Sequence, residues 1–456
     1  MNALILSGLS GVVMMFSSFL LGKHTVRILA QVLFFLVIVA TALELRGVTF
    51  FHVNTKGMLS FDHFALLFSL IAAICTWVFS LLSARDMEKV GADFADYFAL
   101  LFFVLSGVII SAAFQSLLLL FLGIEIMSIP LYILAGSDKR NLKSNEASLK
   151  YFLLGSFSTG LMLMGIALIY GATGTFSTVN MNLPAGPAPV LLIAGLLLLL
   201  FSLSFKVSAA PFHFWAPDVY DGTPTVFTSF MATVVKAAGF IAFIRLFSDA
   251  FQSIGVQWKL VAAIVAAATL FVGNITAVFQ QSVKRMLAYS SIAQAGFMML
   301  AVYTLTAEAK EGLLLYGAAY SLATIGIFAV LVKMRDYSFD GFNGFAKQQP
   351  LIAATLVIFL LSLAGIPLTA GFLSKFYMLR ATVAVGNIGL AIFAVLMAAV
   401  SVYYYFRLIQ AMYFKEGTAT ITGHVSVGFK ATLVGVAAVT IILGVYPNLL
   451  LYWLYF

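Results

Sequence analysis

Long apolar segments follow one another along the whole chain, and short polar connections separate them. A helix needs about 20 apolar residues to cross about 30 Å of hydrocarbon, and on that rule we expect about fourteen transmembrane helices. The polar connections are too short to hold a soluble domain. The pattern therefore predicts an all-α, polytopic membrane protein with a single membrane domain over residues 1–456.

Two of the apolar segments are interrupted. The segment 189–222 is too long for one straight crossing and contains Pro211 and Pro217. The stretch LSLAGIPLTAGFLSKFYML contains Gly365 and Pro367. Proline removes a backbone donor and clashes with the preceding turn, so we predict breaks in the seventh and twelfth helices. Broken helices at matching positions in two halves of a chain indicate an inverted-repeat transporter.

The two predicted breaks lie five helices apart, and an odd interval gives two repeats of opposite orientation. The repeat is inferred from the breaks and not from residue-level identity between the halves. We expect three N-terminal helices, a first repeat of helices four to eight, a second repeat of helices nine to thirteen, and one last helix, over residues 1–90, 91–248, 258–415 and 425–456.

The composition is typical of a membrane protein and excludes several classes of function. Only 9% of the residues are charged, whereas a soluble domain has about 25%. The net charge of +8 comes without a basic tract, which argues against nucleic acid as a partner. Cys75 is the only cysteine, which excludes an intrachain disulfide, a cysteine zinc site and an iron–sulfur cluster. Glycine-rich nucleotide motifs are absent, so we predict neither a cofactor nor a metal in this chain.

Lysine and arginine are unevenly distributed over the connections. Cytoplasmic loops carry an excess of these residues. Most of the 25 in this chain fall on that side if the N-terminus lies outside. The bias predicts an even number of crossings with both termini on the outer side. The start MNALILSGLSGVVMM lacks a basic region, so we expect a membrane helix and not a cleaved signal.

Four ionisable residues lie far from the ends of their apolar segments: Glu125, Lys206, Lys236 and Lys375. A charge at the bilayer centre costs roughly 2.5–3.5 kcal/mol and commonly marks a path for ions or protons. Burial disfavours the charged form of a lysine and favours reversible protonation near neutral pH. These residues predict proton transfer within the membrane. A structural ion pair or a neutral acid is the alternative for Glu125, and snorkelling to the interface is the alternative for Lys206 and Lys375.

The distance between such groups sets the strength of their interaction. Two unit charges about 6 Å apart interact by about 2.8 kcal/mol at an effective dielectric near 20. That energy equals about two pKa units, so a movement of Glu125 towards Lys206 changes the proton affinity of the lysine roughly a hundredfold. A row of such groups can take up a proton on one side and release it on the other.

Four further residues are weaker candidates. Lys150 follows Glu146 by four positions, which indicates an ordinary pair on a helix surface. His213 lies in the first interrupted segment, where it could relay protons or bind freed backbone carbonyls. Tyr289 and Tyr404 could line a hydrated path, although hydroxyls that hold helices together are the more common case.

Five stretches resemble the antiporter-like membrane subunits of respiratory complex I: LFLGIEIMSIPLYILAG, NEASLKYFLLGSFSTG, SFKVSAAPFHFWAPDVYDGTPT, VKRMLAYSSIAQAGF and LSLAGIPLTAGFLSKFYMLR. The resemblance covers nearly the whole chain. The stretch PFHFWAPDVYDGTPT is quite specific. Its Asp-Val-Tyr-x-Gly pattern resembles the subunit N family of bacterial NADH–quinone oxidoreductase more than its paralogues or the related cation/proton antiporters.

The resemblance implies roles for particular residues. Glu125, Lys206 and Lys236 match the family's glutamate on helix five, lysine on broken helix seven and central lysine on helix eight. Lys375 matches the lysine on broken helix twelve, thought to serve the outer side, and Lys150 matches a further lysine on helix six. The family fold is an inverted five-helix repeat with a hydrated polar axis across the membrane.

The resemblance also implies a setting and an activity. We expect a proton-translocating, non-redox subunit of an NADH–quinone oxidoreductase in a bacterial inner membrane. FMN, iron–sulfur clusters and quinone would lie in other subunits. The expected partners are the other membrane subunits, notably antiporter-like subunit M and small subunit K, together with lipids.

The chain departs from the family at one position, and rival functions stay open. The family often carries a histidine on helix ten where this chain has Gln294. Either water completes the relay there, or the histidine is not essential. The first rival is a subunit of a secondary cation/proton antiporter, and the second is a structural scaffold with inert ion pairs. A subunit of a membrane-bound hydrogenase or photosynthetic complex lies closer to the main interpretation.

Overall fold

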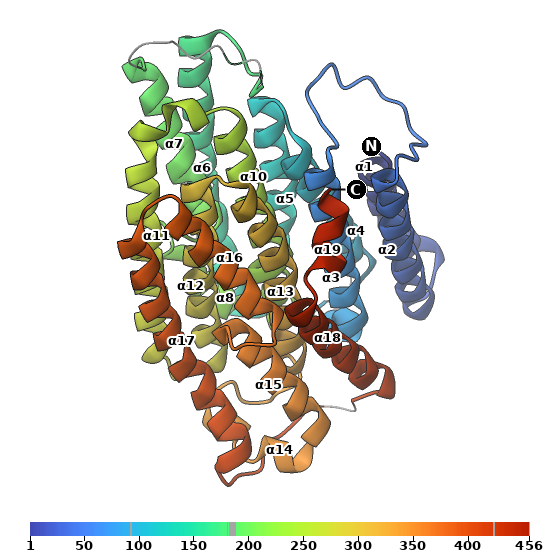
Figure 1. Cartoon of the computed structure of the whole chain (residues 1–456). Coiled ribbons are helices and arrows are strands. Elements are labelled where there is room, and N and C mark those ends of the chain that lie inside the picture. The colour runs from blue at the N-terminus through green and yellow to red at the C-terminus, as the bar shows by residue number, and fades with distance from the viewer. Residues whose placement is uncertain (92–93, 180, 182–187, 423–424, 456) are drawn as a thin grey trace.

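The computed structural model describes residues 1–91, 94–179, 181, 188–422 and 425–455. The predicted first repeat, 91–248, includes residues 92–93, 180 and 182–187, and the predicted last helix, 425–456, includes residue 456; these residues lie outside this range. The described chain forms helices joined by loops (Figure 1). In chain order the elements are α1 (Asn2–Leu20), α2 (Lys23–Leu45), α3 (His63–Met87), α4 (Phe94–Ala113), α5 (Leu117–Ala135), α6 (Leu142–Thr173), α7 (Val190–Lys206), α8 (Trp215–Gly222), α9 (Thr225–Phe230), the π-helix η1 (Met231–Val235), α10 (Lys236–Asp249), η2 (Gln252–Ile254), α11 (Gly255–Val278), α12 (Val283–Thr304), α13 (Ala307–Leu331), η3 (Asp340–Phe342), α14 (Phe345–Gln348), α15 (Pro350–Ala364), α16 (Ala370–Ala384), α17 (Ile388–Phe414), α18 (Val427–Val445), α19 (Asn448–Leu451) and η4 (Tyr452–Leu454).

Twelve uninterrupted helical segments of the described chain are long and apolar enough to cross a membrane. The two predicted broken helices supply the other crossings: the seventh is divided into α7 and α8, and the twelfth into α15 and α16. α7 ends at Lys206, and α15 ends at Ala364, where Gly365 adopts a φ of +86°. The prediction of an all-α, polytopic protein with these two breaks is confirmed.

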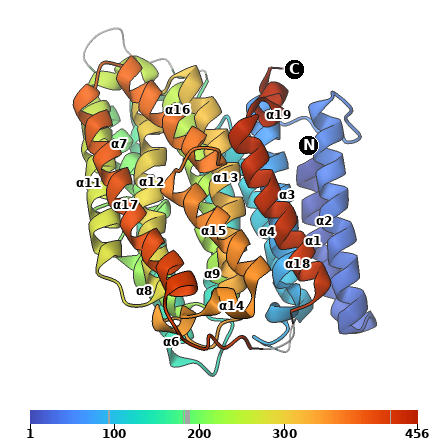
Figure 2. The ribbon, with the colours of Figure 1, turned by 60° about the horizontal axis from the view of Figure 1, so that its bottom comes forward.

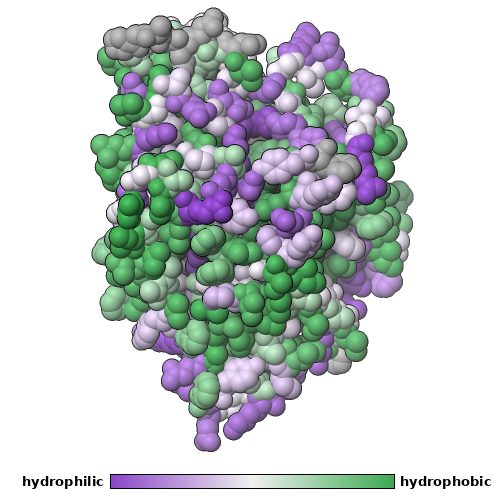
Figure 3. All heavy atoms as spheres, in the orientation of Figure 1, coloured by the Kyte–Doolittle hydropathy of each residue, from purple (hydrophilic) through white to green (hydrophobic). Residues whose placement is uncertain are grey.

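A few helices are enclosed by the others (Figures 1 and 2). α13 and the segment Thr225–Asp249, which joins α9, η1 and α10, are wholly buried over their apolar stretches. α1, α2, α17 and α18 are buried over less than half of theirs. The face in Figure 3 shows a broad band of hydrophobic residues, with hydrophilic ones gathered towards both ends. A protein that spans a bilayer needs this pattern, because the hydrophobic band faces the hydrocarbon and the hydrophilic ends reach the water on either side.

The start of α1 and the short α19 lie at the same end of the bundle (Figures 1 and 2). Two contacts hold this end together: the amino group of Met1 pairs with Glu44, and the guanidinium of Arg46 lies 5.4 Å from the ring centre of Trp453. α14 and the connection between α17 and α18 lie at the opposite end. An even number of crossings requires the two ends of a chain to lie on one side, as these elements do.

Each predicted half of the chain contains a matching backbone contact. Ser116, just before α5, forms an antiparallel bridge with Ser177, just after α6. Ser282, just before α12, forms the same kind of bridge with Ser338, in the loop after α13. Each predicted repeat therefore closes its second and third helices with the same contact. The bounds 91–248 and 258–415 stay a prediction.

Close helix packing repeats in the same way. A side chain at Gly107 on α4 would meet the backbone nitrogen of Met127 on α5, and one at Gly273 on α11 would meet that of Ala293 on α12. The two glycines are as far apart in the sequence as Met127 and Ala293, and as far apart as the serines that precede α5 and α12. The backbone geometry thus shows a correspondence between the two segments at these positions.

Candidate functional site

The four predicted charges lie inside the bundle on four different helices. Glu125 lies in α5, Lys206 ends α7, Lys236 begins α10 and Lys375 lies in α16. Lys236 and Lys375 are 2% and 5% exposed. The side chains of Lys206 and Glu125 are 7% and 20% exposed. The lysine amines bind groups within the bundle, so snorkelling does not describe Lys206 or Lys375.

Glu125 and Lys206 form an ion pair across α5 and α7. The lysine Nζ lies 3.5 Å from Oε1 of Glu125, and it also donates to Ser128 Oγ at 3.1 Å and Tyr132 OH at 3.4 Å. The Thr159 hydroxyl donates to the same carboxylate oxygen at 2.7 Å. At such a distance two charges attract by about 4 kcal/mol at an effective dielectric near 20, and their lost hydration opposes this attraction. A small movement of either group therefore changes how firmly the lysine holds its proton.

Lys236 lies directly after the five-residue π-helix Met231–Val235. Single π-helical turns inside α-helices frequently occur at functional sites. The Lys236 amine donates to the carbonyl oxygen and the hydroxyl of Ser291 on α12, at 3.0 and 2.9 Å, and lies 5.7 Å from the ring centre of Tyr220. Among the described residues no carboxylate pairs with it. A structural ion pair therefore does not explain why a lysine is buried here.

Lys375 binds the end of the broken twelfth helix. Its amine donates to the carbonyl oxygens of Leu363 and Ala364 at 2.7 and 3.0 Å, and it lies 4.8 Å from the ring centre of Phe297. The last carbonyls of a helix lack intrahelical partners and carry partial negative charge, so they attract a cation. A side chain at Gly365 would come within 2.9 Å of the lysine Cδ. The break thus supplies both the acceptors and the space for Lys375.

Gln294 connects the surroundings of Lys236 and Lys375. Its Nε2 donates at 2.9 Å to the carbonyl oxygen of Leu363, the atom that also accepts from Lys375. Gln294 lies one turn beyond Ser291 on α12, and Ser291 accepts from Lys236. Ser291 and Gln294, one turn apart on α12, therefore bring the polar surroundings of the two lysines next to each other.

A small cavity of about 10 Å³ lies beside Gln294. About 10–15 Å³ is enough for one water molecule where polar partners are present. Tyr316 donates to Gln294 Oε1 at the wall of this cavity, and Tyr320 donates to the carbonyl oxygen of Ala232 at 2.8 Å. The size of the cavity suits a single water, and Gln294, Tyr316, Tyr320 and Ser362 supply polar side chains to its otherwise apolar wall. Its lining residues are Gln294, Tyr316, Ala319, Tyr320, Ser362, Leu363 and Gly371.

Lys150 lies apart from the buried charges, in a polar cleft of about 250 Å³. Its side chain is 41% exposed and pairs with Glu146 at 2.8 Å, as the sequence predicts. It also pairs with Asp218 on α8 at 3.1 Å, and Arg285 binds the other oxygen of that aspartate at 3.0 Å. The sequence did not indicate the pairing with Asp218, which links α6, α8 and α12.

The three possible relay residues lie in different surroundings. Tyr404 is fully buried and donates to an asparagine of α11 at 3.0 Å, and its neighbour Tyr405 accepts from Gln294 at 3.1 Å. His213 is half-buried in the segment between α7 and α8, and Tyr289 is half-buried on α12. Within the described residues, no hydrogen bond joins His213 or Tyr289 to the buried lysines. The tyrosines of α17 are therefore better placed than His213 or Tyr289.

Lys284 is a further buried cation, which the sequence did not single out. It is 4% exposed in the first turn of α12, and its amine donates to the carbonyl oxygens of Asp221 and Thr223, both at 2.8 Å. Asp221 lies in the last turn of α8 and Thr223 directly follows it, so Lys284 and Lys375 both bind carbonyls at the end of a half-helix. Nothing in the sequence shows the depth of a lysine so close to the start of a helix.

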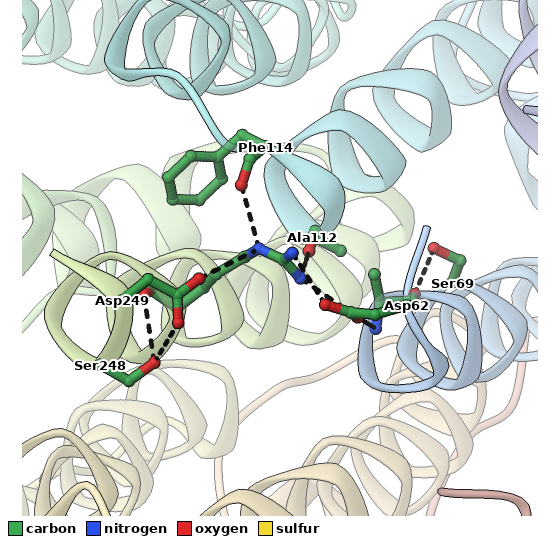
Figure 4. A network of polar contacts seen from close by, with 8 residues as sticks. Asp62, Ser69, Ala112, Phe114, Ser248 and Asp249 are labelled. Atoms are coloured by element: carbon green, nitrogen blue, oxygen red, sulfur yellow. Dashed lines mark hydrogen bonds and ion pairs between the residues drawn. The ribbon is translucent and has the colours of Figure 1, made fainter. Parts of the chain in front are cut away.

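Arg245 is also buried, and the sequence did not single it out either. It is 4% exposed within α10, and its Nη2 lies 2.8 Å from Oδ2 of Asp62 (Figure 4). The guanidinium also donates to the carbonyl oxygens of Ala112 and Phe114 at 2.9 and 3.0 Å, and Asp249 lies 3.8 Å from Nε. Arg245 therefore joins α10 to the start of α3 and to the turn between α4 and α5.

The described residues contain no group of three or more His, Cys, Asp or Glu side chains placed to hold a metal ion. Cys75, the single cysteine, is a buried free thiol. The buried groups at the centre of the bundle are amines, a carboxylate and hydroxyls. Such groups bind and release protons according to the charges and hydrogen bonds around them.

Comparison with known proteins identifies the family. The family model described as "NADH:quinone oxidoreductase/Mrp antiporter, TM" matches residues 115–401. NADH-quinone oxidoreductase subunit N of Cytophaga hutchinsonii is 40% identical over 459 residues, with 99% of each chain covered. The chain belongs to the subunit N family of NADH-quinone oxidoreductases. The resemblance predicted from the motifs is confirmed.

Solved structures agree with this assignment. A chain of respiratory complex I from Thermus thermophilus, solved with bound aureothin, is 32% identical and superposes with a TM-score of 0.85, covering 99% of this chain and 98% of that one. A chain of the Mrp complex from a Dietzia species superposes with a TM-score of 0.87 at 19% identity, covering 99% and 95%. The second likeness shows the fold alone. The protein is a multi-pass membrane subunit of the complex I type.

Proposed function

We propose that this subunit N family member moves protons across a bacterial inner membrane through Glu125, Lys206, Lys236 and Lys375. The observation that carries the proposal is the pairing of the lysines. Lys206 has one carboxylate at 3.5 Å, whereas Lys236 and Lys375 bind only neutral oxygens in the described chain. Amines buried without a fixed counter-charge are costly, and such residues in membrane proteins mark proton paths.

The transfer begins at the ion pair. Quinone reduction in other subunits shifts charge along the interior and changes the distance between Glu125 and Lys206. When the carboxylate moves away, Lys206 loses an attraction of about 4 kcal/mol and gives up its proton towards Lys236. When the carboxylate returns, Lys206 takes up another proton, so the pair resets with each turnover.

The second half of the path uses the cavity beside Gln294. The Lys236 ammonium releases a proton, which passes by way of a water in that cavity of about 10 Å³ to the Lys375 amine. Lys375 binds the carbonyl of Leu363, a residue of the cavity wall, and neither lysine lines the cavity directly. Gln294 does not titrate, but it fixes the position of the Leu363 carbonyl that Lys375 also binds. The proton then leaves Lys375 on the outer side. This assignment gives Gln294 a positioning role where relatives often carry a histidine.

The remaining parts of the proposal concern the setting. The subunit itself carries no electron-transfer centre, and FMN, the iron–sulfur clusters and quinone belong to other subunits. Subunits M and K are its expected neighbours, and both termini face the outer side. The distribution of lysine and arginine over the loops and the shared end of α1 and α19 support this orientation.

Replacement of Lys236 by methionine tests the proposal. Methionine keeps the length and packing of the side chain but binds no proton. We expect an assembled complex whose coupled turnover falls at least about tenfold, since a positioned proton-transfer group contributes ~10²–10⁴-fold. Quinone-dependent NADH oxidation and acidification of proteoliposomes are measured on the same preparation. Lys415→Met, an exposed lysine after α17, is the matched control and stays at the wild-type rate. Normal pumping by the Lys236 variant would contradict the role.

Identification of the partners separates this function from that of a free-standing antiporter subunit. The proposal expects the chain to co-purify in mild detergent with flavin- and iron–sulfur-containing subunits. An antiporter subunit travels without them. The 40% identity to a subunit N, against 19% to the Mrp chain, favours the first outcome.

A further inference from the structure

A cleft of about 310 Å³ lies among α2, α3 and α18, at the end of the bundle that carries the lysine- and arginine-rich loops. It contains none of the residues of the proposed proton path. In Figure 2, α18 runs along α3, and α1 and α2 lie to its right. The lining residues are Arg27, Ile28, Gln31, Leu81, Leu82, Ala84, Arg85, Lys333, Ser426, Gly428, Phe429 and Thr432.

The cleft carries an excess of positive charge. Arg85 is exposed near the end of α3, and the described chain supplies neither a carboxylate nor a hydrogen-bond partner for its guanidinium. Arg27 pairs with Glu88 at 2.8 Å. Asp86 is shared, because Lys333 and Lys89 each bind one of its oxygens at 2.8 Å. Four cations therefore face two carboxylates in the cleft and at its rim, and Arg85 stays available for an external anion.

The other side of the cleft is apolar and opens outward. Ile28 on α2 and Leu81 on α3 are 50% and 40% exposed, and both belong to helices that cross the membrane. Leu82 and Phe429 form the buried wall behind them. A ligand that fills this cleft must therefore be charged at one end and apolar at the other.

Two further features point to a ligand with an anion and hydrogen-bond donors. Oε1 of Gln31 is buried and has no hydrogen-bond partner in the described chain, while its Nε2 donates to Ser80 at 2.6 Å. α18 also begins at the cleft, where Ser426 caps the helix by accepting from the backbone nitrogen of Phe429 at 3.2 Å. The N-terminus of a helix attracts negative charge, and here that effect adds to the nearby arginines.

We propose that this cleft binds the phosphodiester headgroup of an anionic phospholipid, with the acyl chains lying along Ile28 and Leu81. Basic pockets between transmembrane helices bind such headgroups. The cleft lies at the small end of the ~300–1,000 Å³ range of ligand pockets, which suits a headgroup and not a whole lipid. A free phosphate would match the cations but would leave the outward apolar wall unused. The proposal does not depend on the proton path.

The test uses the whole complex, purified in mild detergent, washed free of lipid and incubated with phosphatidylglycerol or phosphatidylcholine. Native mass spectrometry then reports the lipid retained by this subunit after release from the complex. We expect retention of phosphatidylglycerol in preference to phosphatidylcholine. Each arginine near the headgroup contributes about 1 kcal/mol, so Arg85→Gln weakens apparent binding about fivefold and Arg85→Glu weakens it further. Arg85 has no described partner, so assembly stays intact, and a native gel checks this.

The matched control is Lys139→Gln, which removes a cation from another loop at the same end of the bundle, outside the cleft. It leaves phosphatidylglycerol retention unchanged. A further arm adds inorganic phosphate, which does not displace the lipid if the apolar wall takes part in binding. The proposal is wrong if both lipids bind equally, if phosphate displaces phosphatidylglycerol, if neither Arg85 variant changes retention, or if the subunit retains no lipid because another subunit covers the cleft.

Discussion

The buried segment Thr225–Asp249 carries two cations, Lys236 and Arg245, with opposite surroundings. Arg245 has a bidentate carboxylate partner in Asp62, a second acid at 3.8 Å and two backbone carbonyls (Figure 4). Lys236 has one serine and the face of a tyrosine ring. Both side chains are at least 96% buried. The helix therefore holds a fully paired charge and an unpaired one under the same degree of burial.

The difference separates a structural charge from a proton-carrying one. A guanidinium does not release its proton in proteins, and its planar fork suits fixed bidentate pairing. An amine can lose its proton, and hydrogen bonds from neutral oxygens do not hold it in the charged form as a carboxylate does. Burial alone thus does not identify a functional charge in this bundle. The decisive property is the set of partners.

Removal of Arg245 gives the largest expected effect, and the effect is on assembly. Arg245→Met leaves Asp62 and two buried carbonyls without their donor, at a cost of about 3 kcal/mol. We expect this subunit to fall strongly in abundance in the isolated complex, as measured by quantitative blotting of membranes. The few complexes that assemble should pump protons normally per turnover. If instead abundance is normal and pumping is lost, the assignment of Arg245 as structural is wrong.

Glu125→Gln changes the proton path with little effect on the fold. Glutamine keeps the acceptor for the Thr159 hydroxyl but removes the charge opposite Lys206. We expect coupled turnover to fall about tenfold or more, because the ion pair no longer controls the lysine proton. Glu125→Asp retains the charge and should recover part of the rate. The rate of proteoliposome acidification is measured for the wild type and for both variants. Equal rates would show that the Glu125–Lys206 pair takes no part in proton transfer.

Much of the fold and part of the site follow from the sequence. Apolar length gives the number of crossings, and proline and glycine give the two breaks, because both signals are local. The sequence alone identifies the four buried charges, because each lies far from the ends of a long apolar segment. They are Glu125, Lys206, Lys236 and Lys375. The partners of these residues are not recognisable in this way, since they come from helices distant in the sequence.

Lys284 and Arg245 show where such reasoning fails. Both lie near the ends of apolar segments, where hydropathy does not distinguish a surface cation from a buried one. The buried Lys284 binds carbonyl oxygens at the end of α8. The buried Arg245 pairs with Asp62, which directly precedes α3. Only tertiary contacts decide these two cases. Lys150 is the converse, because its predicted pair with Glu146 is local and is present in the structure.

Substitution of Gln294 has the smallest expected effect on activity. Gln294→His introduces the residue that the family resemblance implies for this position and keeps a donor for the Leu363 carbonyl, so we expect turnover within about twofold of wild type. Gln294→Leu removes the donors and the acceptor of Tyr316 and should lower turnover by severalfold. Turnover and proton pumping of the two variants are compared in the same membranes. A normal rate for Gln294→Leu would remove Gln294 from the path.

Replacement of Lys236 by arginine tests the central claim most directly. Arginine keeps a buried cation near Ser291 but does not give up its proton, because its pKa lies above about 12. The measurement is the rate of proteoliposome acidification per NADH oxidised, on complex whose assembly has been verified. If Lys236 carries protons, Lys236→Arg assembles and pumps as poorly as Lys236→Met. If it acts only as a fixed charge, the arginine variant pumps at the wild-type ratio, and that result would contradict the account.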